Sequence, residues 1–419
     1  MSQETSTLGR SDRVNIRETT MTAQPSPLSL DLLQLALRGE GSAFRFRARL
    51  QPAGGPGDKV FPPTYAEGQD GRKHETRYAT EMRVVAGERK PSVLLDSVAS
   101  QANRMEQALL EARRRSEIPL PVISVDFAES VPELGKLSSL ETPHRVYDAI
   151  LRDATLNGVA FRASEVGRKL TDASPADARA MFEYCPTALL FGGWDSTGPR
   201  GGMGHKFQRV LVSEVVAIGF ETGTKVGSRI DPLQISAGVR VDIPKGDSDR
   251  WTVDASGKSK QRPSEVNHSN IAPTRDEESG GVTFEYALHT AVLSLPAVRR
   301  LRFGGWDAAK SDAARLVLVA LGLLAITLQR RAGYDFRSRC TLVPESPSSF
   351  ELVSADGSTR AYALDVADAE ALLKGAVDAA RGVGVAFHDD EVLLAPMPKL
   401  VQLIRASQEE LRTRSGAES

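Results

Sequence analysis

Cysteine is nearly absent from this 419-residue chain. Only Cys185 and Cys340 occur, with no Cys-x-x-Cys pair and no spacing typical of metal ligands. So few cysteines exclude a disulfide framework and are typical of a protein in a reducing cytoplasm. The six histidines show no paired spacing either, so we expect no metal site and no cofactor.

Motifs for nucleotide hydrolysis, zinc chemistry or serine chemistry are also missing. The glycine-rich segment 198–206 invites comparison with a phosphate-binding loop, but Phe207 follows its lysine where that loop requires Ser or Thr. No Gly-x-Gly-x-x-Gly opens a helix, and neither His-Glu-x-x-His nor Gly-x-Ser-x-Gly occurs. Asp195 and Asp231 could hold a metal ion for phosphodiester cleavage, yet no second carboxylate or histidine accompanies either. We therefore predict no catalytic residue.

Long apolar runs are absent too. The longest, residues 316–328, is shorter than the roughly 20 residues that a membrane helix needs, and we expect it to form a buried core helix. The N-terminal segment lacks the apolar stretch of a secretory signal. We expect a cytoplasmic protein with no membrane partner. Residues 1–27 are polar, and we expect them to be disordered.

The net charge of −1 hides an uneven distribution. Residues 44–115 carry 14 Lys and Arg against 9 Asp and Glu, whereas residues 351–419 carry 7 against 12. The basic segment near the N-terminus predicts an anion-binding face. The acidic segment at the C-terminus predicts a surface that faces solvent or a partner.

The most informative stretch is residues 187–232. Its apolar runs, 188–191 and 210–220, resemble strands, and each leads into a loop with glycines and cations. Glycine lets backbone N–H groups converge on an anion without a Cβ in the way, although a hairpin with long turns has the same pattern. A second Phe-Gly-Gly-Trp-Asp at 303–307 could mark an equivalent strand end, but one pentamer is weak evidence for a repeat.

Three further segments between residues 44 and 115 carry the basic charge. Residues 44–51 alternate apolar and basic side chains, which predicts a strand with one buried and one cationic face, or an edge guarded by charge. The Gly- and Pro-rich segment 52–90 predicts a finger-like loop. Residues 97–115 predict a helix capped by Asp96 or Ser97, whose polar face suits phosphate and base contacts or is simply solvated.

The remaining periodic segments predict alternating strands and helices. We expect strands at 121–127, from 282, at 337–344 and at 349–354, and helices at 28–38, 144–156, 176–183, 308–331, 366–381 and 399–412. Residues 245–281 lack periodicity and predict a mobile insertion. The order favours an α+β fold: one elaborated domain, 28–419, with an RNA-recognition-motif-like (ferredoxin-like) antiparallel sheet, large insertions that include the finger-like loop, and a helical C-terminal region.

Five segments resemble one protein family closely. They are RLQPAGGPGDKVFPPTY (49–65), LLDSVASQANRME (94–106), HRVYDAILRD (144–153), FGGWDSTGPRGGMGHKFQRVLVSE (191–214) and GSRIDPL (227–233). The family is the CRISPR-associated backbone subunit of the type I-G (formerly I-U) Cascade complex, a branch of the repeat-associated mysterious protein superfamily. Residues 1–27 and 245–281 fall outside the resemblance.

The resemblance implies a non-catalytic, crRNA-binding subunit with an RNA-recognition-type fold and an inserted thumb. Copies of it would form a homo-oligomeric filament along one CRISPR RNA and present the guide to target DNA in an antiviral ribonucleoprotein. Further implied partners are a large subunit, a crRNA-processing or handle-binding subunit, and a helicase-nuclease recruited after target binding. Within the family-like motifs, side chains with charge or amide chemistry are predicted to contact the guide RNA: Lys59, Gln101, Asn103, Arg104, Arg200, Lys206, Arg209 and Arg229.

Two alternatives remain open. Related subunits of type III systems cleave target RNA with a loop aspartate, so a metal-dependent ribonuclease that uses Asp195 or Asp231 is the second hypothesis. A stand-alone binding module of unknown ligand is the third.

Overall fold

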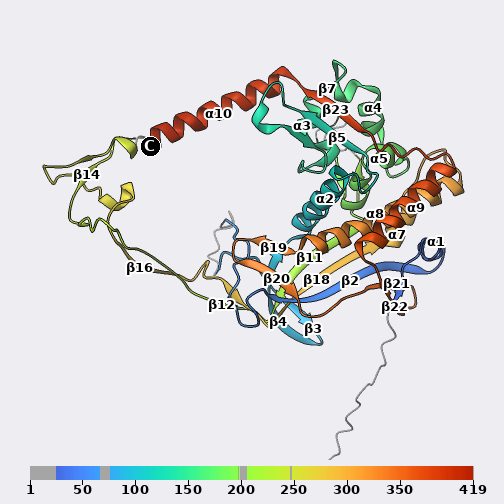
Figure 1. Ribbon diagram of the computed structural model, residues 1–419, viewed down its shortest axis with the longest axis horizontal. Helices are drawn as coiled ribbons and strands as arrows, with labels where there is room; N and C mark the ends of the chain where they lie inside the picture. The colour runs from blue at the N-terminus through green and yellow to red at the C-terminus, as the bar shows by residue number, and fades with distance from the viewer. Residues whose placement is uncertain (1–24, 67–75, 197, 199–204, 246–247, 419) are drawn as a thin grey trace, which may run out of the picture.

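The computed structural model describes residues 25–66, 76–196, 198, 205–245 and 248–418 (Figure 1). In these residues the chain forms a large sheet with helices on one face, a smaller sheet beside those helices, and a long two-stranded arm. The predicted α+β fold is therefore confirmed. Most of the N-terminal segment expected to be disordered lies outside the described residues. Its end, β1 (Ser26–Pro27), pairs with the large sheet instead of being disordered.

Ten strands make up the large sheet. Its main path runs in the order β1, β22 (Thr359–Ala363), β21 (Phe350–Ser354), β2 (Gly41–Pro52), β18 (Tyr286–Ser294), β11 (Leu211–Ile218), β4 (Glu88–Asp96) and β3 (Thr80–Val85). β20 (Cys340–Pro344) pairs with β2 and with β19 (Tyr334–Arg337). All these pairings are antiparallel except that of β1 with β22.

The central strands β2 and β18 alternate as the sequence predicts. The apolar side chains of β2 are buried on the helix-covered face, and its arginines lie on the other face: Phe44, Phe46, Ala48 and Leu50 against Arg45, Arg47 and Arg49. Arg45 pairs with Glu351 of β21 at 2.7 Å. The predicted strand with one buried and one cationic face is confirmed.

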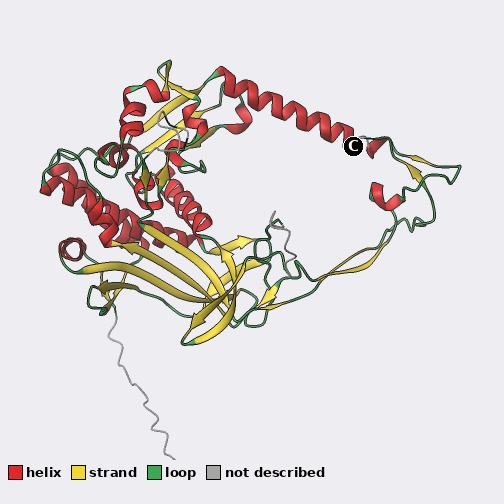
Figure 2. Ribbon diagram, turned by 180° about the vertical axis from the view of Figure 1, so that it is seen from behind, coloured by secondary structure: helices red, strands yellow, loops and turns green. Residues whose placement is uncertain are grey.

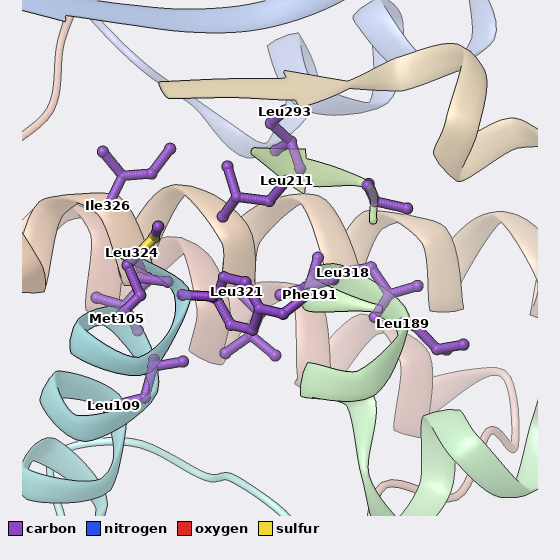
Figure 3. Packing of buried hydrophobic residues seen from close by; sticks show 14 of the residues in the cluster. Met105, Leu109, Leu189, Phe191, Leu211, Leu293, Leu318, Leu321, Leu324 and Ile326 are labelled. Atoms are coloured by element: carbon purple, nitrogen blue, oxygen red, sulfur yellow. The ribbon is translucent and has the colours of Figure 1, made fainter. Parts of the chain in front are cut away.

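Helices pack on one face of this sheet, as Figure 2 shows. They are α1 (Leu30–Arg38), α2 (Val98–Arg114), α7 (Leu295–Arg300), α8 (Ala308–Ala332) and α9 (Val366–Gly382). In the core beneath them, Leu321 and Leu324 of α8 lie with Met105 of α2 and Phe191 (Figure 3). By length and composition α8 could cross a membrane, but 78% of its most apolar window is buried in the protein, as expected for a core helix.

The smaller sheet joins distant parts of the chain. Its order is β6 (Lys136–Ser138), β5 (Val122–Asp126), β23 (Glu391–Pro396), β7 (Ala154–Leu156) and β8 (Val159–Ala160). Short helical segments lie next to it: η1 (Pro132–Leu134), η3 (Phe161–Ala163), α3 (Ala149–Arg152), α4 (Glu165–Asp172) and α5 (Arg179–Tyr184). From β23 the chain continues into α10 (Pro398–Glu418), which runs toward the tip of the arm (Figure 1).

The arm connects β11 to β18. β12 (Glu221–Thr222) pairs with β17 (Val282–Thr283) at its base, and β13 (Lys225–Arg229) pairs with β16 (Ile271–Asp276) along its length. Its outer part holds β14 (Val241–Asp242), β15 (Thr252–Val253), η5 (Ser248–Arg250) and η6 (Pro263–Val266). The predicted insertion, 245–281, is therefore only the second half of a paired arm, whose ladder joins residues 42 to 51 positions apart.

Several predicted elements are wrong in type. Residues 188–191 belong to a helix, α6 (Pro186–Phe191), because a short buried apolar run does not distinguish strand from helix and Pro186 suits a helix start. The predicted helix 144–156 breaks into η2 (Arg145–Tyr147), α3 and β7. The predicted loop 52–90 ends at the β3–β4 hairpin. The repeated pentamers are not equivalent either, since one follows α6 and the other leads into α8.

Candidate nucleic-acid interface

A group of cations and aromatic rings lies where the loop after β2, the start of α2 and the β19–β20 hairpin meet. We call it the basic cluster; its members are Lys59, Phe61, Arg104, Phe336, Arg337 and Arg339. The hairpin turn rests on the loop, because Phe61 donates its N–H to the Arg339 carbonyl at 3.0 Å and Arg337 donates to the Pro62 carbonyl at 3.1 Å. Three segments far apart in the sequence thus present one surface.

Each ring of the basic cluster carries a cation. The Arg339 guanidinium lies 4.4 Å from the centroid of Phe61, and the Lys59 ammonium lies 5.6 Å from the same ring. The Arg104 guanidinium lies 4.9 Å from the centroid of Phe336. Proteins bind single-stranded nucleic acid with cations and aromatic rings placed side by side. The cations contact the phosphates, and the rings stack on the bases.

Hydrogen bonds to the end of β4 and to β19 fix the position of the Arg104 side chain. Its guanidinium donates to Asp96 at 3.1 Å and to the carbonyls of Asp335 and Phe336 at 3.1 and 2.8 Å. Ser97 caps α2, as predicted, by accepting the Ser100 N–H. This combination aligns the helix start with the hairpin, and Asn103 is exposed beside it on α2.

Gln101 is not available to RNA, so its prediction as a guide contact is wrong. Its side chain is fully buried, donating to Asp96 at 2.6 Å and accepting from Ser213 of β11 at 3.0 Å. Ser213 also bonds His289 of β18 at 2.9 Å. A side-chain amide at a helix start can hydrogen-bond either a buried carboxylate or a nucleobase. Because Gln101 is buried, its amide bonds the Asp96 carboxylate.

The base of the glycine-rich loop forms a second cationic surface. We call it the loop base: Trp194, Lys206 and Arg209. β9 (Gly193–Trp194) pairs with β10 (Lys206–Phe207), and the Lys206 ammonium lies 4.2 Å from the ring centroid of an exposed Trp194. Arg209 is exposed just beyond β10. Arg200, another predicted contact, lies outside the described residues.

A buried ion pair fixes the loop base to α2. Arg145 makes a bidentate pair with Glu106 of α2, both distances being 2.7 Å, and donates to the Gly192 carbonyl at 3.2 Å. Burial raises the pKa of Glu106, and the Arg145 charge opposes that shift. Gly192 has φ +86°, and a Cβ there would lie 3.1 Å from the Phe207 carbonyl oxygen, so glycine is required at this turn.

Arg229 lies apart from both surfaces, within the arm. Its guanidinium donates to the carbonyls of His268 and Ser269 at 2.6 and 3.1 Å, which ties the two sides of the arm together. Asp231 accepts the backbone N–H groups of Leu233, Ile235 and Ser269. Desolvation opposes these bonds, but together they lower the pKa of Asp231.

Asp195 is also used structurally. Asp195 lies just after β9 and is 5% exposed, and its carboxylate accepts a hydrogen bond from Arg162 at 2.7 Å. Neither Asp195 nor Asp231 belongs to a group of three metal-binding side chains within the described part of the chain. Both aspartates considered for ribonuclease chemistry therefore hold loops in place.

The structure brings together only part of the predicted set. Lys59 and Arg104 meet in the basic cluster with Asn103 nearby, and Lys206 and Arg209 meet at the loop base. Sequence reasoning missed Arg337 and Arg339, which are both exposed. The only signal for them was the Arg-Ser-Arg of residues 337–339, two cations separated by a small turn residue.

Comparison with known proteins agrees with the family resemblance. Residues 44–222 match the family model described as CRISPR-associated protein GSU0053. No curated protein matches the sequence. Among solved structures, the crystal structure of Thermofilum pendens Csc2 is 10% identical, with a TM-score of 0.25, over 94% of this chain and 84% of that chain. The resemblance to a CRISPR-associated family, drawn from the motifs, is confirmed.

Proposed function

We propose that this chain, whose residues 44–222 match a CRISPR-associated family, is a non-catalytic crRNA-binding backbone subunit of a type I-G interference (Cascade) complex. Several copies polymerise along one guide RNA and present it for pairing with target DNA. The observation that carries the proposal is the basic cluster, where two rings and four cations gather from three distant segments. Such contacts read backbone charge and base faces rather than sequence, as a subunit that holds variable guides requires.

The central sheet supports an RNA-recognition-motif-like fold for this subunit. The spatial order β21, β2, β18, β11 is the order of strands four, one, three and two in a β-α-β-β-α-β unit. α2 lies between β2 and β11 in the chain, and α8 lies between β18 and β21. The arm is then an insertion in the hairpin between strands two and three, which is the position we assign to the thumb.

The arm also supports polymerisation. Several of its large apolar side chains are exposed, with Val226, Ile230 and Leu233 exposed by 64%, 84% and 70%. A two-stranded arm is too thin to bury these side chains itself, so they can be buried only against another surface. We propose that this surface belongs to the neighbouring copy bound to the same guide RNA.

We propose no catalytic role, since Asp195 and Asp231 both hold loops. Within the part of the chain that the structure describes, no group of three metal-binding side chains favours the ribonuclease alternative. We place the subunit in the cytoplasm, where its two buried free cysteines stay reduced. Its further partners are the large subunit, the crRNA-processing or handle-binding subunit, and the helicase-nuclease recruited after target binding.

The test is RNA co-purification from cells that express the chain with a CRISPR array. Lys206→Glu together with Arg339→Glu reverses one charge in each cationic surface. We expect the variant to lose nearly all bound RNA, seen as a fall in the 260/280 nm absorbance ratio, because repulsion replaces phosphate contacts. Its melting temperature should stay near that of the parent, since the reversed side chains are exposed.

Arg360→Glu is the matched control, because Arg360 is an exposed arginine on β22, near the far edge of the sheet. It should keep its RNA. Undiminished absorbance in the double variant would show that neither surface holds the guide, and a parent protein that purifies as an RNA-free monomer would favour a stand-alone binding module.

A further inference from the structure

A pocket of about 300 Å³ opens between the end of α8 and residues 345–349, the loop from β20 to β21. Phe46 and Ala48 of β2 contribute apolar side chains to it, and Tyr334 of β19 also lines it. Among the described residues that line the pocket, Arg330 of α8 is the one cation. The proposed function makes no use of this pocket.

Arg330 carries a partly buried positive charge that no carboxylate neutralises within the part of the chain that the structure describes. Burial lowers its pKa, and the neighbouring Tyr334 hydroxyl opposes this shift. Glu345, the acidic residue in the pocket lining, pairs instead with Arg49 at 3.0 Å. The dipole at the end of α8 favours a cation but does not neutralise it. Because a buried charge without a partner is costly, this guanidinium points to an anion from outside the chain.

The guanidinium of Arg330 has donors to spare for such an anion. It lies 4.0 Å from the ring centroid of Phe46 and 5.8 Å from that of Phe350. Among the described residues, Tyr334 is the one side chain that hydrogen-bonds it, and none of its nitrogen atoms is both fully buried and without a partner. A guanidinium has more N–H groups than one hydroxyl can satisfy, so the others remain accessible beside the Phe46 ring.

The loop 345–349 adds neutral donors to the same pocket. Ser346 and Ser348 both line it, and Ser346 is exposed. Within the described part of the chain, the backbone N–H groups of these two serines make no hydrogen bond, and the Ser348 hydroxyl reaches only the Ser346 carbonyl, at 3.4 Å. A guanidinium beside unused hydroxyl and N–H groups suits a phosphate, whose several oxygens accept more hydrogen bonds than a carboxylate does.

We propose that Arg330 and the loop 345–349 bind one phosphate of the RNA strand that crosses the basic cluster. The inference rests on the proposed function. The pocket adjoins the basic cluster, because the ring centroids of Tyr334 and Phe336 are 6.2 Å apart. A phosphate held here neutralises Arg330 and fixes the RNA backbone next to the bases that stack on the rings of the cluster.

The test maps phosphates in the purified RNA–protein particle with ethylnitrosourea, which alkylates accessible phosphate oxygens. In the parent particle we expect protected phosphates at a regular spacing. Arg330→Met keeps an unbranched side chain and removes the charge, so one protected phosphate per subunit should regain the reactivity of free RNA. The RNA content should stay near that of the parent, because the basic cluster and the loop base are intact.

A second measurement follows the affinity of salt-stripped protein for single-stranded RNA over a series of salt concentrations. The slope of log affinity against log salt should be smaller by about 0.7 in Arg330→Met, the value for one phosphate of a single strand.

A second variant guards against misfolding of the first. Ser348→Asp gives the pocket a carboxylate of its own and leaves Arg330 in place. It should raise the melting temperature of the RNA-free protein and release the same phosphate. Arg360→Met makes the matched change at an exposed arginine on β22 and should keep the pattern of the parent.

The outcomes separate the inference from the proposed function. An RNA-free parent overturns the proposed function, whereas an RNA-loaded parent with the same protected phosphates in every variant overturns the phosphate site alone. Fewer copies per RNA in Arg330→Met, with the protected phosphates unchanged, would assign Arg330 to an acidic side chain of the neighbouring subunit and would also overturn it. Inorganic phosphate that raises the melting temperature of the RNA-free parent but not of Arg330→Met, with the particle's pattern unchanged, would assign the pocket to a free phosphoryl ligand instead.

Discussion

His289 sits in the middle of a hydrogen-bonded chain that crosses the helix-covered face of the sheet. Its Nε2 bonds Ser213 at 2.9 Å and its Nδ1 bonds Tyr334 at 3.1 Å. Because Ser213 donates its hydroxyl proton to Gln101, His289 donates from Nε2 and accepts at Nδ1, which is the neutral ring. Burial, with help from the nearby Arg330 charge, lowers the pKa of His289 to about 3. One neutral imidazole thus links β18, β11, α2 and β19, and so supports the position of Arg104.

This arrangement predicts that the protein loses stability in mild acid. The unfolded chain takes up a proton on this histidine near pH 6.5, whereas the folded chain does so only near pH 3. The His289 contribution is therefore fully present above pH 6.5 and falls as the pH drops toward 3. Between pH 7 and pH 5 the loss is about 2 kcal/mol, measured by urea unfolding at both values. In His289→Gln the difference between the two pH values should shrink by that amount; an unchanged difference would contradict the neutral buried ring.

At the level of elements, α2 is the support on which both cationic surfaces depend. Arg104 on one side holds the β19–β20 hairpin, and Glu106 on the other holds Arg145 and, through it, the turn at Gly192. Two of the five family-like segments, 94–106 and 144–153, meet in this ion pair. Much of what those motifs encode is therefore the placement of the loop rather than contact with a ligand.

Breaking the ion pair predicts a large loss of stability. Arg145→Met removes the cation and leaves the Glu106 carboxyl buried without its partner, which should cost about 3–5 kcal/mol in the free energy of unfolding. Glu106→Gln combined with Arg145→Met removes the charge as well, and we expect it to recover part of that loss. Urea unfolding of the two single variants and the double variant measures the coupling. Additive effects would show that the pair does not act as a unit.

On the scale of the whole molecule, the chain combines a helix-covered sheet, a smaller sheet and an arm in one architecture. The arm leaves the large sheet directly between β11 and β18 and extends away from the helix-covered core (Figure 1). Some large apolar side chains of the arm are exposed in the single chain, among them Ile230 and Leu233. The single chain therefore has a buried core of its own, but its arm leaves apolar side chains exposed to solvent.

The exposed apolar side chains of the arm predict substitutions that block the proposed polymerisation and leave the stability of the single chain unchanged. Ile230→Ser together with Leu233→Ser removes two exposed apolar side chains, so the melting temperature of the RNA-free subunit should change little. If copies polymerise through the arm as proposed, the mass of the RNA-bound particle should fall, because the variant lacks the apolar contact proposed between neighbouring copies. Mass photometry of the co-expressed particle measures this. Leu35→Ser, an equally exposed change on α1, is the control, and a full-mass particle in the arm variant would contradict the proposed interface.

The sequence by itself determined the elements with strong local periodicity. The alternation of residues 44–51, the capped helix after Ser97 and the long apolar helix around residue 320 all lie where the pattern placed them. The basic character of residues 44–115 and the family motifs also came from sequence alone. These features depend on neighbours within a few positions, so they can be read along the chain.

Only the tertiary structure decided which polar residues are free to meet a ligand. Gln101 and Asn103 are two positions apart on one helix, yet Gln101 is buried and Asn103 exposed. Lys59 and Arg339 share the ring of Phe61 although 280 residues separate them, and β13 pairs with β16 across the arm. Such pairings depend on which surfaces are buried together. Burial and long-range pairing arise from the whole chain at once, and no local pattern records them.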